Sequence, residues 1–443
     1  MGLRKREYTD RETIITAQSM NEIQDAILEL EDGLFSVDND KSGNVISITD
    51  AAKRGFRSLN IYGKTTQDGT PTPDAPVLLK SAGNDGSITA NVTGKNLLSV
   101  SDLTLMINNG CVESKTDSSI TVTNTAGGTS SYLLYRWLPV SALDGKKITV
   151  SLKIAADNGV SPGILIGYSN ADGSIRYNID ISQVAGNRFT TTYTVDSNSE
   201  KAQGCEYICF WFYSRSLGNV KYFDIQVELN SSATEYEIHK KQTLSISTPN
   251  GLPGIPVTSG GNYTDADGQQ WVCDEIDFAR GVYVQRVGVK QYTDGAEWGA
   301  AFNIGDRVLD DRFRVALDEI PLSFVGMSNM HSIVENWGVS DGSIGFNGSD
   351  VYVYARFPGI TSKESLGELF SSTPLIIAYG KKEPIETPLT EEELAAYAAL
   401  YTYKGNTTVS NDAGAYMELE YVMDAKKYID SLMAGGIAPA TVE

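Results

Sequence analysis

Apolar and polar residues alternate along most of the chain, and this period of two is the pattern of half-buried β-strands. In the segment KKITVSLKIAAD, the alternation puts Ile148, Val150, Leu152 and Ile154 on one face. The same alternation is found in RFTTTYTVD, CEYICFWFY and KYFDIQVEL. Strands of this kind, joined by polar turns between about residues 97 and 241, predict an antiparallel sandwich of the jelly-roll type.

Shorter predicted strands precede and follow this region, so the chain is expected to be mainly β. Leu59 and Ile61 alternate with polar residues before it, and further strands occur between residues 242 and 384. One stretch between them, Asn250–Trp271, reads NGLPGIPVTSGGNYTDADGQQW and is dense in turn residues. Its prolines are excluded from a central strand, and DADG is typical of a hairpin turn.

A helix is predicted near the N-terminus, in SMNEIQDAILELEDGLF, where Ser19 and Glu22 form a capping box. Its apolar residues recur at the a and d spacing of a coiled coil: Met20, Ile23, Ile27 and Leu30. A helix packed on its own domain would carry the same stripe. A short terminal helix is marginal alone, which favours self-association. We therefore interpret residues 1–35 as an oligomerisation helix and 36–56 as a linker.

The C-terminal part, residues 385–443, changes character and predicts a helix, a strand and a second helix. Thr390 and Glu393 form a capping box that opens the first helix. AYMELEYVMD alternates as a strand does, and Asp424 is placed to cap the last helix.

The composition of the chain argues against several classes of function. The formal net charge is −20, and so acidic a surface repels phosphates, which argues against nucleic-acid binding. No apolar run is long enough to span a membrane, so we expect no membrane insertion. The N-terminus carries basic residues without an apolar core, which is not the pattern of a signal peptide.

The residue types in the sequence argue against a catalytic site and against a metal site. The chain has only two histidines, His239 and His331, and neither lies in a nucleophile or zinc motif. The four cysteines, one pair of them at Cys205 and Cys209, fit buried free thiols. Asn250–Trp271 lacks the following helix of a phosphate loop and the spacing of an EF-hand. We therefore expect no enzyme, no cofactor and no metal ion.

Carboxylates are abundant, so their proximity alone means little. Asp274, Glu275 and Asp277 lie together in CDEIDF, where a glycosidase would need two of them held across a cleft. A solvated strand face is the more economical interpretation of these three residues.

The candidate binding residues are aromatic and lie on the strand CEYICFWFY. Its apolar face, with Phe210 at the centre, should fill the jelly-roll core, so Tyr207, Trp211 and Tyr213 should point the other way. Sugar rings stack on such aromatic faces while tyrosine hydroxyls bind sugar hydroxyls. The alternative is that a loop or a neighbouring subunit covers this face.

Several segments resemble minor structural proteins of tailed phages that infect Gram-positive bacteria. These segments are GKTTQDGTPTPDAPV, GKNLL, NGLPGIPVTSGGNYTDADGQQWVCDEIDFARGVYVQR and VSNDAGAYMELEYVMDAKKYID. ITAQSMNEIQDAI looks like the helical entry of tail and baseplate components. IQVELNSSATEYEIHKK looks like the last strand of the carbohydrate-binding-module-like jelly roll that such proteins carry. In similar proteins the first and third segments are nearly adjacent. The separation here indicates a jelly roll, 97–241, inserted into a β domain made of 57–96 and 242–384.

The resemblance implies a virion protein of the tail tip, baseplate or tail fibre, with a homotrimer favoured and other phage tail proteins as partners. Such a protein is made in the host cytoplasm and released by lysis. Host cell-wall polysaccharide would be the ligand of the jelly roll. Two alternatives stay open: a purely structural baseplate connector or head fibre without glycan binding, and a depolymerase. The depolymerase lacks support because neither a β-helix repeat nor a convincing acid pair is found.

Overall fold

The computed structural model describes residues 36–38, 45–51, 53–126, 131–180, 184–185, 188–300, 303–304, 307–308, 312–334, 339, 341–346, 348–403 and 405–422. In this part the chain is mainly β, as predicted, with two α-helices, α2 (Lys363–Ser372) and α3 (Glu391–Ala398). The predicted N-terminal helix with its seam (Met20, Ile23, Ile27 and Leu30) and the helix after Asp424 lie outside the described residues.

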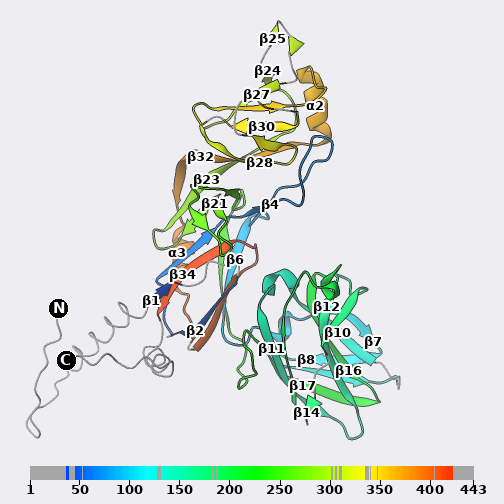
Figure 1. Cartoon of the computed structure of the whole chain (residues 1–443). Coiled ribbons are helices and arrows are strands. Elements are labelled where there is room, and N and C mark those ends of the chain that lie inside the picture. The colour runs from blue at the N-terminus through cyan, green and yellow to red at the C-terminus, as the bar shows by residue number, and fades with distance from the viewer. Residues whose placement is uncertain are drawn as a thin grey trace, which may run out of the picture.

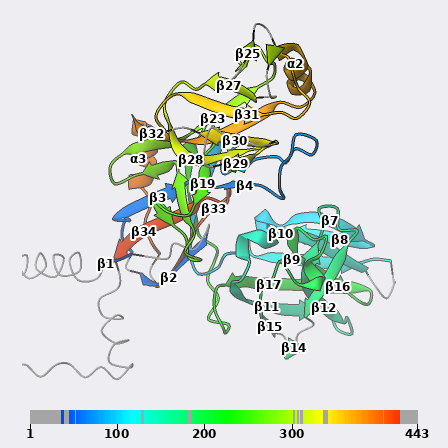
Figure 2. The same ribbon diagram turned by 45° about the horizontal axis from the view of Figure 1, so that its top comes forward.

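The jelly roll is a sandwich of two antiparallel sheets that stands beside the rest of the chain (Figures 1 and 2). One sheet has the order β13 (Arg176–Asp180), β12 (Pro162–Ser169), β16 (Tyr207–Ser214), β10 (Ser131–Pro139) and β7 (Thr104–Asn109). The other has the order β14 (Val184–Ala185), β15 (Arg188–Thr194), β11 (Lys147–Ala156), β17 (Gly218–Glu228), β9 (Ser119–Asn124) and β8 (Cys111–Lys115).

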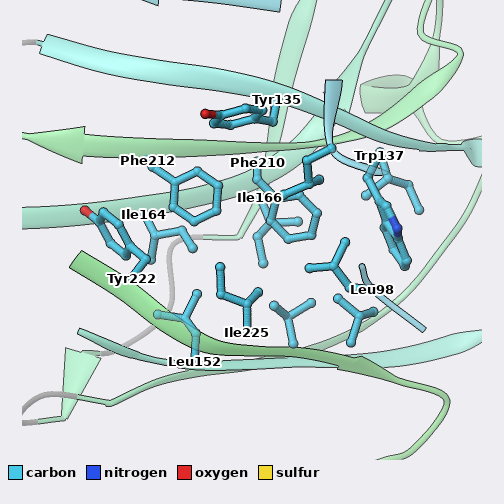
Figure 3. Packing of buried hydrophobic residues seen from close by; sticks show 14 of the residues in the cluster. Leu98, Tyr135, Trp137, Leu152, Ile164, Ile166, Phe210, Phe212, Tyr222 and Ile225 are labelled. Carbon is cyan, nitrogen blue, oxygen red and sulfur yellow. The ribbon is translucent and has the colours of Figure 1, made fainter. Parts of the chain in front are cut away.

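The inner faces of the two sheets form one core, and Figure 3 shows side chains from both meeting in it. Phe210 and Phe212 on β16 lie over Leu152 on β11 and Ile225 on β17, and all four are at most 1% exposed. Because alternate residues of a strand point to opposite faces, the period-two pattern of the sequence selects these side chains for the core.

A second sandwich, here called the base, is built from segments on both sides of the jelly roll. Its larger sheet has the order β1 (Ser36–Asp38), β34 (Tyr416–Val422), β3 (Ser58–Tyr62), β22 (Glu275–Asp277), β23 (Val282–Tyr292), β32 (Leu375–Pro388) and β28 (Pro321–Ser328). The smaller has the order β18 (Lys241–Ser247), β6 (Ser87–Thr93), β33 (Gly405–Asn411) and β2 (Val45–Ala51). Apolar residues of both sheets, among them Ile61 and Ile88, share one core.

Two short sheets lie against the base, and a third unit continues its larger sheet. The short sheets are β19 (Gly254–Val257), β21 (Gln270–Cys273) and β20 (Tyr263–Thr264), and β4 (Thr65–Thr66) with β5 (Lys80–Ser81). The third unit, here called the distal unit, contains α2 and the strands β24 (Gly299–Ala300), β27 (Arg312–Ala316), β31 (Tyr352–Arg356), β30 (Ser343–Phe346) and β29 (Ser332–Val334). A further hairpin joins β25 (Asn303–Ile304) and β26 (Arg307–Val308). The distal unit has its own aromatic core and lies at the far end of the molecule from β1 (Figure 1).

Two predicted boundaries were wrong. Residues 36–56 are not simply a linker, because β1 pairs with β34 and β2 pairs with β33. The C-terminal region 385–443 is not a separate unit in its described part, because β33 and β34 lie inside the two base sheets. Long-range strand pairing decides both points, and alternation within a single strand carries no information about its partner.

The jelly roll enters and leaves the base at a single point. Thr93, the last residue of β6, pairs with Lys241, the first residue of β18. Beside this pair, the buried Asn96 side chain donates to the carbonyl oxygens of Ile225 and Glu237, at 3.0 and 3.1 Å. Its Oδ1 accepts from the backbone N–H of Leu98 and of Val227, both at 3.1 Å. The two connecting segments are therefore held together.

Removing Leu97–Glu237 and joining the ends with a short flexible linker should leave a folded remainder. The ends to be joined, Asn96 and Ile238, are already close, because Asn96 donates to the carbonyl oxygen of Glu237 next to Ile238, and the apolar cores of the jelly roll and the base share no residue. Tolerated domain insertions have ends this close. We expect a single cooperative thermal transition for the base in circular dichroism. An aggregated or molten remainder would show that the base needs the jelly roll to fold.

Candidate functional site

The aromatic residues predicted to bind sugars lie on the outer face of β16, in the middle of its sheet. Ile208, Phe210 and Phe212 fill the jelly-roll core, as the alternation predicts. Tyr207, Trp211 and Tyr213 project from the opposite face, in three different environments.

Trp211 is not exposed to solvent, contrary to the platform predicted from the sequence. Its side chain is 2% exposed and packs with the buried Leu134 and Cys209. A Cβ added at Gly167 would collide with the Tyr177 carbonyl oxygen and lie 2.8 Å from the Trp211 ring, so strand β13 and this ring are packed closely. The sequence left open the alternative that a loop or a neighbouring subunit covers this face. Trp211 is indeed covered, and the cover comes from other segments of the same chain.

The turn between β12 and β13 covers the same face. A Cβ at Gly173 would meet Leu134, Met106 and Ile107 at 3.0 to 3.3 Å, which places this turn directly over those apolar side chains. Gly173 has a φ of +74°, a left-handed conformation that favours glycine. Sequence alternation cannot show this cover, because the turn folds back from the adjacent strand.

Tyr207 is half-buried, and another side chain of its own sheet lies over it. The Arg136 guanidinium is 4.6 Å from the centroid of the Tyr207 ring, within the usual range of a cation–π contact. This ring face is therefore already in contact with a charged partner.

Tyr213 is half-buried and forms a pair with a residue that the sequence analysis missed. Tyr132 on β10 lies directly across from it in the register of β10 and β16. The ring centroids are 5.4 Å apart with an interplanar angle of 49°. The missed signal is the alternation in SYLLYRWLP, which puts Tyr132, Leu134 and Arg136 on the same face.

Two arginines flank these rings. Arg176 donates to the Tyr132 hydroxyl at 3.0 Å, and its guanidinium lies 5.5 Å from the centroid of that ring. Arg215 lies above Gly163, where an added Cβ would be 3.3 Å from its nitrogens and 3.4 Å from the Tyr213 Cβ. We call these four residues, Tyr132, Tyr213, Arg176 and Arg215, the tyrosine-pair site.

The Tyr213 hydroxyl stays protonated at neutral pH. Burial raises the pKa of Tyr213, and the neighbouring Tyr132 raises it further, while Arg176 and Arg215 oppose the shift. The site thus combines half-exposed ring surface, a neutral hydroxyl that can donate or accept, and cationic donors. Rings of this kind pack against the C–H faces of sugars, and guanidinium groups bind oxygen pairs.

The turn-rich stretch Asn250–Trp271 forms a hairpin, and its turn has a second role that the sequence did not reveal. Asp265 Oδ1 accepts from the N–H groups of Asp267 and Gln269, at 3.1 and 2.9 Å. Its Oδ2 accepts from the Trp271 indole at 2.9 Å and from the Tyr416 hydroxyl at 3.1 Å. The aspartate therefore ties this turn to the last strand of the base.

The carboxylates of CDEIDF do not form a solvated strand face. Asp274, Glu275 and Asp277 are between 2% and 8% exposed. Asp274 Oδ1 accepts from the N–H groups of Arg286 and Val287, at 2.7 and 2.8 Å, where the pairing of β23 with β32 shifts register. Burial raises the pKa of Asp274 to about 6, although these hydrogen bonds oppose the shift. The Asp274 carboxylate therefore accepts the backbone N–H groups that a β-bulge leaves without strand partners, which is a structural role.

The described residues offer few other side chains that could act as nucleophiles or metal ligands. The cysteines are free, with Cys111, Cys209 and Cys273 buried and Cys205 half-buried, and burial raises the pKa of each thiol. In this part of the chain, no group of three or more His, Cys, Asp or Glu side chains is arranged to hold a metal ion. Neither helix described here is long and apolar enough to cross a membrane.

No protein-family model and no curated protein matches the chain. Solved structures similar to it include the CBM22-1 and GH10 modules of Clostridium thermocellum endo-1,4-beta-D-xylanase 10B complexed with xylohexaose, with 11% identity and a TM-score of 0.21. That match covers 31% of this chain and only 28% of the xylanase chain.

Two further structures are carbohydrate-binding modules. A CBM4 structure is 18% identical with a TM-score of 0.20, covering 28% of this chain and 79% of that one. A variant of a family 29 carbohydrate-binding module is 13% identical with a TM-score of 0.21, covering 32% of this chain and 91% of that one. The likeness concerns fold over part of the chain and assigns no ligand to it.

Proposed function

We infer that the chain is a structural component of a phage tail, in the tip, baseplate or fibre, whose jelly roll binds polysaccharide on the host surface. The sequence segments that resemble tail proteins of phages infecting Gram-positive bacteria support the first part. The tyrosine-pair site carries the second part. Tyr132 and Tyr213 offer half-exposed rings side by side, with Arg176 and Arg215 next to them.

Binding at this site would use stacking and hydrogen bonding together. A pyranose ring placed on Tyr213 would bury its C–H groups against the aromatic face, and the hydroxyl of Tyr213 would bond a sugar oxygen. Arg215 has an exposed side chain, so it can turn toward hydroxyl or carboxylate oxygens of a second sugar unit. No step in this function is catalytic and none uses a cofactor.

Weak single sites become useful when several act at once. We propose a homotrimer, assembled through the seam at Met20, Ile23, Ile27 and Leu30 and placed in the virion among other tail proteins. Three linked sites on a repeating polysaccharide would raise the overall affinity far above that of one site. Release from the host by lysis would need no secretion signal.

Alanine replacement at the tyrosine pair tests the glycan part of the proposal. Tyr213→Ala and Tyr132→Ala should each weaken binding of the purified protein to isolated Gram-positive cell-wall polysaccharide by roughly 3- to 10-fold per site, the scale of one aromatic contact. Surface plasmon resonance on immobilised polysaccharide measures this change. Tyr352→Ala is a matched control, because Tyr352 is a half-buried tyrosine with Arg314 4.6 Å from its ring, but it lies in the distal unit.

The purely structural alternative predicts a different result. The observation in favour of a baseplate connector or head fibre without glycan binding is the burial of Trp211, which removes the tryptophan of the predicted platform from solvent. If the wild-type protein binds no polysaccharide in a broad panel, the jelly roll only packs. If the wild type binds and all three tyrosine variants bind as well as it does, the tyrosine pair is not the binding site.

A further inference from the structure

The tyrosine-pair site contains two arginines that have no acidic partner. The whole chain has 56 Asp and Glu residues against 36 Lys and Arg residues, so carboxylates are in excess over cations. Elsewhere in the chain, Arg280, Arg286 and Lys153 each form an ion pair, at 2.6, 2.8 and 2.8 Å. Among the described residues, neither Arg176 nor Arg215 forms one. Both positive charges at this site are therefore left without a carboxylate.

Both arginines are exposed, and both act on the same half-buried ring. Burial raises the pKa of Tyr213, and Arg176 and Arg215 are the positive charges that oppose this shift. A guanidinium group is always protonated in a protein, so these charges do not depend on pH. The net charge of −20 acts weakly here, because charges further away than the Debye length of about 8 Å at physiological ionic strength are largely screened. The local potential is therefore positive.

Two carboxylates lie in the turns that adjoin this site, and each is bound by its own neighbours. Asp157, in the turn before β12, accepts through Oδ2 from the backbone N–H and the side-chain amide of Asn219, at 2.9 and 2.8 Å. Asp172, in the turn after β12, accepts through Oδ1 from the backbone N–H of Ser174 at 2.9 Å. These aspartates stabilise their turns and do not neutralise the arginines.

The backbone beneath the site is fixed from the jelly-roll core. The buried Tyr222 of β17, at one end of this core in Figure 3, accepts from the N–H of Gly163 at 3.2 Å. Its hydroxyl also lies 2.7 Å from the carbonyl oxygen of Gly163 and next to that of Tyr213. Because Gly163 has no side chain, the Arg215 guanidinium can lie over strand β12 beside Tyr213. A site that is ordered in advance loses less entropy on binding.

We propose that the tyrosine-pair site binds an acidic glycan, in which two oxygens that share one negative charge bind Arg176 and Arg215 while a neighbouring sugar ring packs on Tyr213. This inference rests on the proposed glycan binding of the jelly roll and names the chemical class of its ligand. The carboxylate of a uronic acid and a phosphodiester both present such an oxygen pair, which matches the planar fork of a guanidinium group. A neutral sugar would displace water from both cations without supplying a negative charge.

Isothermal titration calorimetry on the full chain tests this proposal with three polymers. Polygalacturonate carries carboxylates, its full methyl ester has the same sugar rings without the charge, and a glycerol-phosphate teichoic acid carries phosphodiesters. At least one acidic polymer should bind the wild type roughly 10-fold more tightly than the methyl ester, the scale of one charge-assisted hydrogen-bond pair. The tighter of the two acidic polymers identifies the source of the charge.

Substitutions at Arg215 test whether the arginines cause this preference. Arg215→Gln removes one charge from an exposed side chain, and should weaken the acidic polymer by roughly 10-fold while leaving the methyl ester unchanged. Arg215→Lys keeps the charge but loses the fork, so its affinity should fall between those of the wild type and Arg215→Gln. Arg188→Gln is the matched control, because Arg188 is an exposed arginine on β15 in the other sheet of the jelly roll. It should change nothing.

Tyr213→Ala separates the failure of this inference from the failure of the proposed function. If Tyr213→Ala weakens all the glycans that bind and Arg215→Gln weakens none, the tyrosine pair binds glycan and the preference for an acidic glycan is overturned. If neither substitution changes binding, the tyrosine pair is not the site, and both proposals fail. Binding of neither acidic polymer overturns the inference. Equally tight binding of polyglutamate, a polyanion without sugar rings, also overturns it, because the site would then recognise charge alone.

Discussion

Trp211→Ala should lower the free energy of unfolding of the jelly roll by about 3–5 kcal/mol, the usual cost of removing a buried aromatic side chain. Trp211 is 2% exposed, and its neighbours on the outer face of the sheet, Leu134 and Cys209, are fully buried. Deleting the indole would leave a cavity beside Gly167, which has no side chain to fill it. Differential scanning calorimetry of the full chain should show the jelly-roll transition at a clearly lower temperature.

Tyr213→Ala is the matched comparison for this prediction. Tyr213 is half-buried, so Tyr213→Ala should lower the melting temperature less than Trp211→Ala does. It should also weaken polysaccharide binding more than Trp211→Ala does. The opposite pattern, with unchanged stability but lost binding for Trp211→Ala, would mean that the indole faces solvent and contacts sugar. That result would contradict the burial of Trp211 among Leu134 and Cys209.

Acid should destabilise the distal unit by about 3 kcal/mol between pH 7 and pH 4 through His331 alone. This side chain is 1% exposed and lies edge-on to the ring of Phe357, with 4.6 Å between the centroids. Within the described residues, neither ring nitrogen has a partner at ordinary hydrogen-bond geometry. Burial lowers the pKa of His331 to about 4 from its usual 6.5. Between these two values the unfolded chain binds a proton that the folded chain excludes, so stability is lost as the pH falls.

His331→Leu isolates this contribution from the carboxylates that titrate in the same range. The variant should lose less stability than the wild type between pH 7 and pH 4 in urea unfolding, and the difference should be close to 3 kcal/mol. At pH 7 the two proteins should differ little, because the wild-type imidazole is neutral there. Parallel pH profiles for the two proteins would show that His331 is protonated in the folded state or is accessible to water.

Local features of this chain follow from short stretches of sequence. The alternation in β16 assigns Phe210 and Phe212 to the core without reference to any other strand. The capping box at Thr390 and Glu393 forms as predicted, with backbone-to-side-chain distances of 3.2 and 2.9 Å. The DADG turn closes its hairpin, because Asp265 binds the N–H groups of its own turn. Each of these features depends only on residues close together in the sequence.

The tyrosine-pair site could be only half predicted. Alternation identifies the face on which Tyr213 lies, but its partner Tyr132 is 81 residues earlier in the chain and meets it only through the register of β10 and β16. The side chain that packs with Trp211 from β10 is Leu134, and the paired strands β12 and β13 lie close to its ring at Gly167. A sequence pattern reports which face a side chain takes, and it cannot report what another segment places over that face.

By itself, the sequence determined the β class of this protein, the core-facing residues of its strands and the local turns and caps, because each depends on nearby residues. Only the tertiary structure decided that β1 and β34 pair, that Asp274 is buried under a bulge, that Trp211 is core and that Arg176 meets Tyr132. Each of these depends on segments far apart in the chain, and their meeting is set by register and packing over the whole fold rather than by any local pattern.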